Sequence, residues 1–257
     1  MKRLIIFLIC VWFLSFSSAL GKEMSAEEIA WEVYNRPVGK DSESYVRMLL
    51  IDAKGRQKER RMYVAVLDTK KVRKTFIRFL SPKDIAGTGF LALAYTNGKE
   101  EQFLYLPALR RTRRIAGSFR FHRFVNSDFT YEDLERHHPQ KYLYQLLGEE
   151  IYQGTPCYLL KTWPKKKKDS AYGWWIQWIT KDGFLPVKIE YYDHQGRICK
   201  RFLAFEWKKI QGYWTVMRSE MADLKKNHKT VLIVEQQIRY DLGLDKKIFT
   251  RRNLAHW

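Results

Sequence analysis

Most of the chain alternates between short apolar runs and turn-forming residues. Residues 187–191 (VKIEY) place hydrophobic side chains at every second position, with charged side chains between them. A period of two is typical of a β-strand with one face in a core and the other in solvent. Turn signals such as Asn97-Gly98 and Gln153-Gly154 separate successive runs. The pattern predicts a mainly β protein of about ten to eleven strands in one antiparallel sheet, strongly curled into an incomplete β-barrel.

Two helical segments are expected to cover the concave face of this sheet. In residues 25–34 (SAEEIAWEVY), Ser25 and Glu28 form a capping box, and one apolar face carries Ala26, Ile29, Ala30 and Val33. A short central helix is predicted over residues 131–136, with Thr130 and Asp133 as its capping pair. Two helices this short do not fill the curl of so large a sheet. The remaining space holds either a packed core of aromatic side chains or a cavity.

The strands supply many bulky candidates for a cavity wall. On the strand around residue 205, we assign Leu203, Phe205 and Trp207 to the apolar face, opposite Phe202 and Glu206. The residues expected to line an acyl-chain cavity are Leu91, Leu93, Phe103, Tyr105, Trp174, Trp178, Ile189, Tyr191 and Phe205. Each of them, taken alone, is more often a core residue than a ligand contact. Together they would hold an acyl chain without any catalytic group, since burying a methylene contributes about 0.8 kcal/mol.

The N-terminus has the features of a secretory signal peptide. Lys2 and Arg3 precede an apolar run over residues 4–16, and small residues precede a cleavage point after Ala19 or Gly21. The run is short for a membrane span, and an uncleaved anchor is the alternative. We expect residues 1–21 to be removed and residues 22–257 to form a single exported domain. Its two cysteines either form a disulfide or remain small buried hydrophobic residues: Cys157 and Cys199.

The chain is strongly basic, with a formal charge of +19, or +17 without Lys2 and Arg3. Such a charge favours polyanionic partners. Export argues against nucleic acid and leaves anionic lipid surfaces or acidic proteins. The lysine run 165–168 is interpreted as a solvated hairpin loop, and contact with anionic lipid head groups is the alternative.

Six arginines fall within residues 110–123, and acidic side chains follow them. Four of the arginines come directly after an apolar strand that ends at Pro107: Arg110, Arg111, Arg113 and Arg114. We expect some of their guanidinium groups to lock the central helix to the barrel rim through ion pairs with Asp128, Glu132 and Asp133. Unpaired arginines would instead hold a lipid head group or contact an acidic partner.

Sequence patterns for catalysis, metal binding or cofactor binding are absent. HExxH and CxxC do not occur, His137 and His138 are adjacent, and no serine lies in a nucleophile elbow. The glycines of residues 85–90 (IAGTGF) are not followed by the Lys-Ser/Thr of a phosphate loop. They are interpreted as strand-entry glycines that permit close backbone approach. We therefore expect a protein that is not an enzyme, with no metal and no cofactor.

Four segments occur in a characteristic order: DIAGTGFL, FLYLPALRRTRRI, NSDFTYEDL and, near the C-terminus, DKKIFTRRNL. In this order the chain resembles the LolA-like outer-membrane lipoprotein-sorting proteins, from Ser25 to the C-terminus. The positions that match the pattern are Tyr105, Leu106, Pro107, Arg110, Arg111, Arg113, Arg114, Ser127, Asp128, Phe129, Tyr131, Glu132 and Asp133.

This resemblance implies an incomplete β-barrel wrapped over helices and a periplasmic, non-enzymatic carrier of lipoproteins or lipids between envelope membranes. The implied partners are acyl chains, an inner-membrane transporter or exporter and the membrane surface, but no nucleic acid. A second hypothesis is a structural or adaptor subunit of an envelope hydrophobe exporter, which needs a solid core instead of a cavity. A third, an exported hydrolase, needs a polar cluster in the cleft that the sequence does not show.

Overall fold

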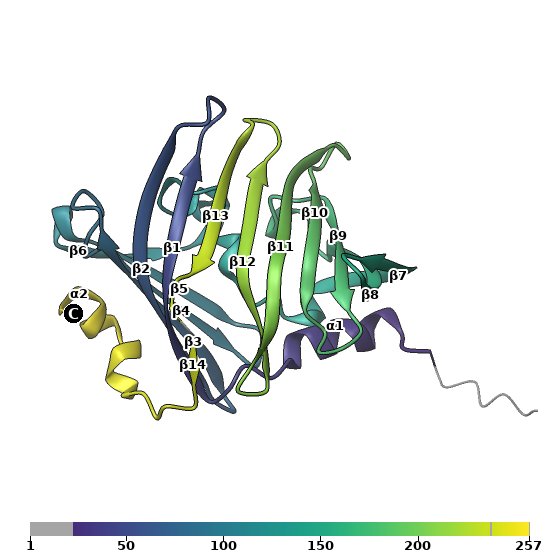
Figure 1. Ribbon diagram of the computed structural model, residues 1–257, viewed down its shortest axis with the longest axis horizontal. Helices are drawn as coiled ribbons and strands as arrows, with labels where there is room; N and C mark the ends of the chain where they lie inside the picture. The colour runs from purple at the N-terminus through teal and green to yellow at the C-terminus, as the bar shows by residue number, and fades with distance from the viewer. Residues whose placement is uncertain (1–22, 237, 257) are drawn as a thin grey trace, which may run out of the picture.

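One antiparallel sheet curls around its own interior and forms the body of the protein (Figure 1). The computed structural model describes residues 23–236 and 238–256, so the predicted signal peptide 1–21 lies outside the described residues. Among the described residues, no helix is long and apolar enough to cross a membrane. The predicted mainly β, unclosed antiparallel architecture is confirmed.

The sheet is built from two antiparallel meanders. The first contains β1 (Asp41–Ile51), β2 (Gln57–Asp68), β3 (Val72–Ser81), β4 (Gly89–Tyr95), β5 (Glu100–Leu106) and β6 (Arg111–Ile115). The second contains β7 (Tyr142–Tyr152), β8 (Thr155–Pro164), β9 (Trp174–Thr180), β10 (Pro186–Tyr192), β11 (Ile198–Ile210), β12 (Tyr213–Asp223) and β13 (His228–Val234). The connections include the 3-10 helices η1 (Pro107–Leu109) and η6 (Lys167–Asp169).

Pairing between β1 and β13 joins the two meanders into one sheet, in a register that runs from Val46 opposite Val234 to Ile51 opposite Lys229. A two-residue strand, β14 (Arg239–Tyr240), pairs with the start of β1. The sheet therefore has fourteen strands, and the sequence-based count of about ten to eleven is too low. Two strands escape that count for a physical reason: β6 has the charged sequence RTRRI without hydrophobic alternation, and β14 is too short to show any period.

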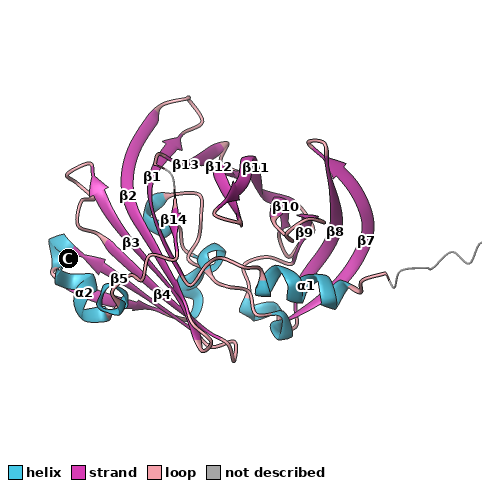
Figure 2. Cartoon of the chain, turned by 60° about the horizontal axis from the view of Figure 1, so that its bottom comes forward, coloured by secondary structure: helices cyan, strands magenta, loops and turns pink. Residues whose placement is uncertain are grey.

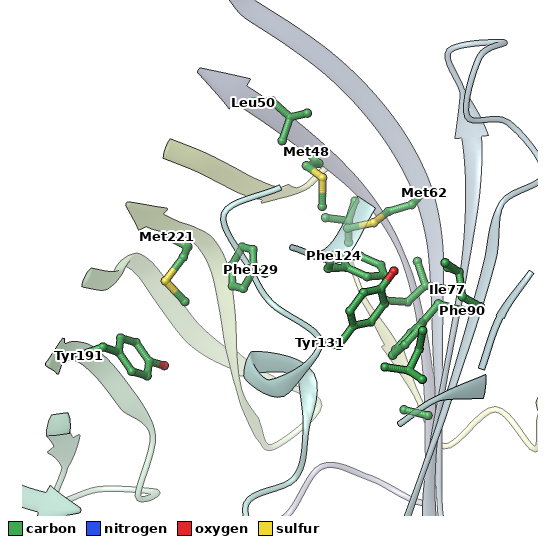
Figure 3. Packing of buried hydrophobic residues seen from close by; sticks show 14 of the residues in the cluster. Met48, Leu50, Met62, Ile77, Phe90, Phe124, Phe129, Tyr131, Tyr191 and Met221 are labelled. Atoms are coloured by element: carbon green, nitrogen blue, oxygen red, sulfur yellow. The ribbon is translucent and has the colours of Figure 1, made fainter. Parts of the chain in front are cut away.

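Strands β6 and β7 follow one another in the chain but lie at opposite ends of the strand order. The segment that connects them, residues 116–141, passes through the interior of the curl, and we call it the central segment. It contains four 3-10 helices: η2 (Gly117–Phe121), η3 (Phe124–Asn126), η4 (Glu132–Leu134) and η5 (Pro139–Lys141). Its rings Phe124, Phe129 and Tyr131 lie between side chains of the first meander and those of the second (Figure 3).

The predicted central helix over residues 131–136 is wrong in length, because only the single turn η4 forms. Its capping pair is present: the Thr130 amide donates to Asp133 Oδ2 at 2.6 Å, and the Asp133 amide donates to Thr130 Oγ1 at 3.2 Å. The backbone becomes extended at Glu135. Three residues later the chain reaches His138-Pro139, and the residue before a proline is disfavoured in helical geometry.

Helix α1 (Ala26–Asn35) forms where the capping box predicts it and covers the concave face of the second meander (Figure 2). The Ser25 amide donates to Glu28 Oε2 at 2.7 Å, and the Glu28 amide donates to Ser25 Oγ at 3.2 Å. Ile29 and Ala30 are buried against Leu160 of β8 and Ile179 of β9. The predicted apolar face of this helix is therefore the face that packs on the sheet.

A second helical element covers the opposite, outer face of the first meander. The C-terminal tail, residues 244–256, contains η7 (Lys246–Phe249) and α2 (Arg251–His256) and buries Phe249 and Leu254 against β2 to β5. Buried Arg78 donates to the Leu254 carbonyl at 2.7 Å. A Cβ atom on Gly89 would lie 2.8 Å from Leu254 Cδ1, which confirms the interpretation of this strand-entry glycine as a site of close approach. The sequence reading did not predict α2, whose six residues are too few for a clear helical period.

The two cysteines of the described chain are both buried, and neither forms a disulfide. Cys157 lies on β8 and Cys199 on β11, and burial raises the pKa of the Cys157 thiol to about 11. The structure therefore agrees with small buried hydrophobic residues and not with the disulfide alternative.

Packing of the tail predicts a specific loss of stability. We expect Leu254→Ala to lower the free energy of unfolding by about 2 to 4 kcal/mol, because a fully buried leucine leaves a cavity when it is truncated. Leu109 is 67% exposed, and Leu109→Ala is the matched control with an expected change below about 0.5 kcal/mol. Urea denaturation measures both variants. Equally small effects would show that the tail is not part of the core.

Candidate functional site

Inside the curl lies an apolar cavity of about 270 Å³, between the two meanders. Its wall follows from the register of the central strands: Val46 is opposite both Met62 and Val234, so all three side chains share the inner face. The residues that line this apolar cavity are Val46, Met48, Met62, Val64, Ile77, Phe124, Phe129, Leu134, Phe202, Val216, Met217, Ser219, Leu232 and Val234. Ser219 is the one polar residue in this wall.

A second cavity, of about 260 Å³, lies between α1 and strands β7 to β10, and we call it the helix-side cavity. Its lining mixes apolar, aromatic and charged groups: Ala30, Val33, Tyr34, Arg36, Arg73, Asp133, Glu135, Arg136, His137, Tyr142, Tyr144, Leu160, Thr162, Trp175, Gln177, Pro186, Ile189 and Tyr191. The central segment is the partition between the two cavities. Leu134 lines the apolar cavity, while its neighbours Asp133 and Glu135 line the helix-side cavity.

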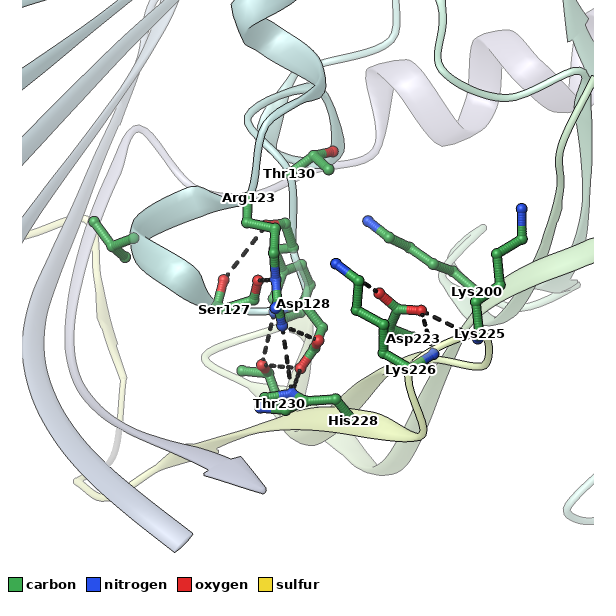
Figure 4. A network of polar contacts seen from close by, with 12 residues as sticks. Arg123, Ser127, Asp128, Thr130, Lys200, Asp223, Lys225, Lys226, His228 and Thr230 are labelled. Carbon is green, nitrogen blue, oxygen red and sulfur yellow. Dashed lines mark hydrogen bonds and ion pairs between the residues drawn. The ribbon is translucent and has the colours of Figure 1, made fainter. Parts of the chain in front are cut away.

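Buried polar contacts fix one end of this partition to β13 (Figure 4). The Asp128 carboxylate accepts hydrogen bonds from Thr230 Oγ1 and His228 Nδ1, each at 2.7 Å, and forms an ion pair with Arg123. The Asp128 amide donates to Thr230 Oγ1 at 2.9 Å. Because these groups are withdrawn from water, each contact contributes more than it would on the surface.

The other end of the partition is fixed to the second meander. The Asp133 carboxylate accepts from the Tyr172 hydroxyl at 2.8 Å and from Lys200 Nζ at 3.1 Å. Glu132 is fully buried and accepts from the Ala171 amide at 3.0 Å. The central segment is thus held by carboxylates whose partners come from strands and loops far away in the sequence.

These contacts correct the predicted ion pairs. Asp128, Glu132 and Asp133 do anchor the central segment, but not to the arginines at residues 110–114. Of those arginines, Arg113 lies over the Phe119 ring at 4.2 Å, and Arg114 forms an ion pair with Glu101 at 3.4 Å. Arg110 and Arg111 are exposed at the edge strand β6 and the turn before it. Arginines and carboxylates are both present, as predicted. From the edge strand β6 and the turn before it, however, these arginines do not pair with the buried carboxylates.

Two of the predicted cavity residues, Ile189 and Tyr191, line the helix-side cavity. The others do not line either cavity. Leu91, Leu93, Phe103 and Tyr105 pack on the outer face against the C-terminal tail. Trp178 belongs to a separate cluster with Cys157 and Val187, Trp174 stacks on Tyr192, and Phe205 is 42% exposed beneath Arg218.

The cause of these errors is strand parity, since a shift of one residue moves a side chain to the other face. In β4, both faces are apolar, and Phe90 points into the interior while Leu91 points out. In β11, the register shifts between Ala204 and Glu206, so alternation read across residue 205 fails, and Phe202 rather than Phe205 lines the apolar cavity. The predicted apolar face of β11 is therefore wrong.

Sequence reasoning also missed most of the apolar wall. Val46 and Met48 alternate with Arg47 along β1, and this signal would have placed them on the inner face. Phe124 and Phe129 carried no periodic signal, because the central segment is irregular.

Burial shifts the pKa values of several groups on the central segment. Desolvation raises the pKa of Glu132 to about 7, although a hydrogen bond from the Ala171 amide opposes it. Desolvation also raises the pKa of Glu135, which forms an ion pair with Arg120 at 2.7 Å, and lowers the pKa of His137. These groups serve the packing of the partition. Among the described residues, no group of three His, Cys, Asp or Glu side chains is placed to hold a metal ion.

Comparison with known proteins identifies solved structures with the same unclosed β-sheet fold. Residues 71–256 match a family model, and its description reads "-like: Uncharacterized protein". A DUF1329 family protein from Desulfovibrio piger is 31% identical, with 89% of this chain and 97% of that chain covered and a TM-score of 0.82. A domain assigned to the outer membrane lipoprotein-sorting proteins, from Vibrio parahaemolyticus, has the same identity and coverage and a TM-score of 0.83.

The chain therefore belongs to the LolA-like family of outer membrane lipoprotein-sorting proteins, as its segment order predicted. A LolA superfamily protein from Nitrosomonas europaea has the same fold at 20% identity, with 90% of this chain and 100% of that chain covered and a TM-score of 0.68. No curated protein sequence matches the chain.

The buried carboxyl group of Glu132 predicts a pH dependence of stability. Its pKa is about 7 in the folded protein and 4.5 when exposed. Between these values the folded state retains a proton that the unfolded state releases, so stability falls as pH rises through this window. We expect Glu132→Gln to reduce that fall by on the order of 2 kcal/mol.

Urea denaturation at a series of pH values tests this expectation. The matched control is Glu206→Gln, which changes a carboxylate whose side chain is 57% exposed. The same pH dependence in Glu132→Gln and in the unaltered protein would contradict a buried, protonated Glu132.

Proposed function

We propose that this protein is a periplasmic carrier that binds acyl chains of lipoproteins or lipids and moves them between envelope membranes without catalysis. The observation that carries the proposal is the apolar cavity, whose wall contains a single polar residue, Ser219. An apolar wall of this kind recognises hydrocarbon and offers no group that would act on a bond. The name of the Vibrio relative, a lipoprotein-sorting domain, supports the same class of cargo.

The volume of the apolar cavity and the free energy of burying methylenes determine how much of an acyl chain it can bind. Each buried methylene contributes about 0.8 kcal/mol, so about ten buried methylenes correspond to micromolar binding. The volume of about 270 Å³ lies just below the range of about 300 to 1,000 Å³ typical of small-molecule sites. A whole acyl chain needs more room than this, and in the proposed carrier that room is made by displacing the rings of Phe124 and Phe129. Both rings belong to the irregular central segment and not to a strand.

The location and the partners follow from this role. The secretory signal and the family support a periplasmic location, and an inner-membrane transporter or exporter would supply the cargo. Two exposed surfaces are available for contact. The lysines 165–168 lie in a loop between β8 and β9 and suit an anionic membrane surface. Arg110 and Arg111 suit an acidic partner.

A substitution that fills the apolar cavity tests the proposal. Leu232 lines the cavity, and its neighbour Ile233 is directed to the other face of β13. We expect Leu232→Trp to weaken binding of a fluorescent fatty acid about tenfold, because an indole displaces at least two methylenes. Ile233→Trp is the matched control and should change the affinity less than about twofold.

Mass spectrometry of the natively purified protein provides a second measurement, and we expect co-purified lipid or lipoprotein. Absence of co-purified lipid, together with equal fatty-acid affinities of Leu232→Trp and Ile233→Trp, would contradict the proposed carrier function. That result would favour the alternative, a structural or adaptor subunit of an envelope exporter, because such a subunit needs the curved surface but not the cavity.

A further inference from the structure

A third cavity, of about 640 Å³, opens at the hairpin end of the same inner face, and its wall is basic. We call it the basic cavity. It is lined by the tip of the β1–β2 hairpin, the central segment and the first residue of β13: Leu50, Asp52, Arg56, Gln57, Lys58, Arg60, Arg123, Asn126 and His228.

The basic cavity continues the apolar cavity along a single strand pair. On the inner face, Met62 is opposite Val46, Arg60 is opposite Met48, and Lys58 is opposite Leu50. Met62 and Met48 line the apolar cavity, whereas Arg60 and Lys58 line the basic cavity. From Met62 to Lys58 is about 13 Å at the rise of a β-strand. Over that distance the wall changes from hydrocarbon to fixed positive charge.

The carboxylates near the basic cavity neutralise only part of its charge. Arg56 is paired with Asp52 at 2.7 Å, and Arg123 is paired with Asp128 (Figure 4). Among the ion pairs of the described residues, none includes Lys58 or Arg60. Arg60 is 9% exposed and donates to the Val125 carbonyl, a neutral acceptor. A cation this poorly hydrated gains from an incoming anion, since ionic hydrogen bonds strengthen where water is excluded.

We propose that the ligand is an anionic amphiphile, with its acyl chain in the apolar cavity and a phosphate or similar anionic head group between Lys58 and Arg60 in the basic cavity. The inference rests on the proposed function and narrows its substrate class. Guanidinium and ammonium groups at adjacent positions on one strand face suit phosphate oxygens, because both form charge-assisted hydrogen bonds to them. The two-residue spacing keeps both cations on the same face as the hydrocarbon wall.

Two lipids that differ only in the head group test this inference. Lysophosphatidic acid and monoacylglycerol with the same oleoyl chain are titrated as monomers against the full mature chain, with displacement of a fluorescent fatty acid as readout. We expect lysophosphatidic acid to bind about tenfold more tightly, and added salt to reduce the ratio of the two affinities towards one. In Lys58→Glu we expect this ratio to fall to about one at low salt.

Lys54→Glu is the matched control, because Lys54 lies in the same hairpin and is exposed but does not line the basic cavity. It should retain the preference for lysophosphatidic acid. Inorganic phosphate is titrated alone, and we expect no displacement of the fatty acid and no saturable heat of binding. Saturable binding of phosphate as tight as that of lysophosphatidic acid would overturn the amphiphile and indicate a free-anion site.

The outcomes separate this inference from the proposed function. If neither oleoyl lipid binds, the carrier itself fails. If both lipids bind with equal affinity, the result supports the carrier function and contradicts the head-group site. Loss of the preference in Lys54→Glu as well as in Lys58→Glu would also overturn the site, because it would show a general effect of surface charge.

Discussion

Pairing of β1 with β13 is the constraint on which the rest of the structure depends. It joins the start of one meander to the end of the other, so the two strands adjacent in sequence, β6 and β7, become the opposite edges of the sheet. Their connection has to cross the interior. The central segment is therefore a consequence of strand order, and the inner space is divided rather than simply enclosed. Without that pairing, the wall formed by Val46, Met62 and Val234 would not exist.

The central segment has no regular backbone ladder, so its position depends on side chains. Asp128 is held by β13, and Asp133 by Tyr172 and Lys200. Burying carboxylates is unfavourable unless they are well paired, and those pairings fix one arrangement of the partition. The rings of Phe124 and Phe129 lie on either side of the Asp128 anchor and contribute non-directional packing. The segment thus combines buried polar anchors with apolar rings that fill the space around them.

Features that depend on neighbouring residues could be predicted from the sequence, whereas features that depend on residues far apart in the chain could not. The hairpins, the capping box of α1 and the family are local patterns, and they identified the fold. Side-chain direction was harder, because β4 is apolar on both faces and β11 is bulged near residue 205. The anchor between Asp128 and Thr230 joins residues 102 positions apart, so no local pattern encodes it. The C-terminal tail was missed because six helical residues show little period, although its aromatic and leucine side chains complete the outer core.

One consequence of the edge strand β6 concerns behaviour in solution. An open sheet exposes unpaired backbone groups at its rim, and such a rim invites a neighbouring molecule to add a strand. At β6 the rim is short and carries Arg111, Arg113 and Arg114, so two copies that approach with their β6 edges together would bring like charges together. The arginines of β6 thus disfavour pairing of this edge with the same edge of a second copy.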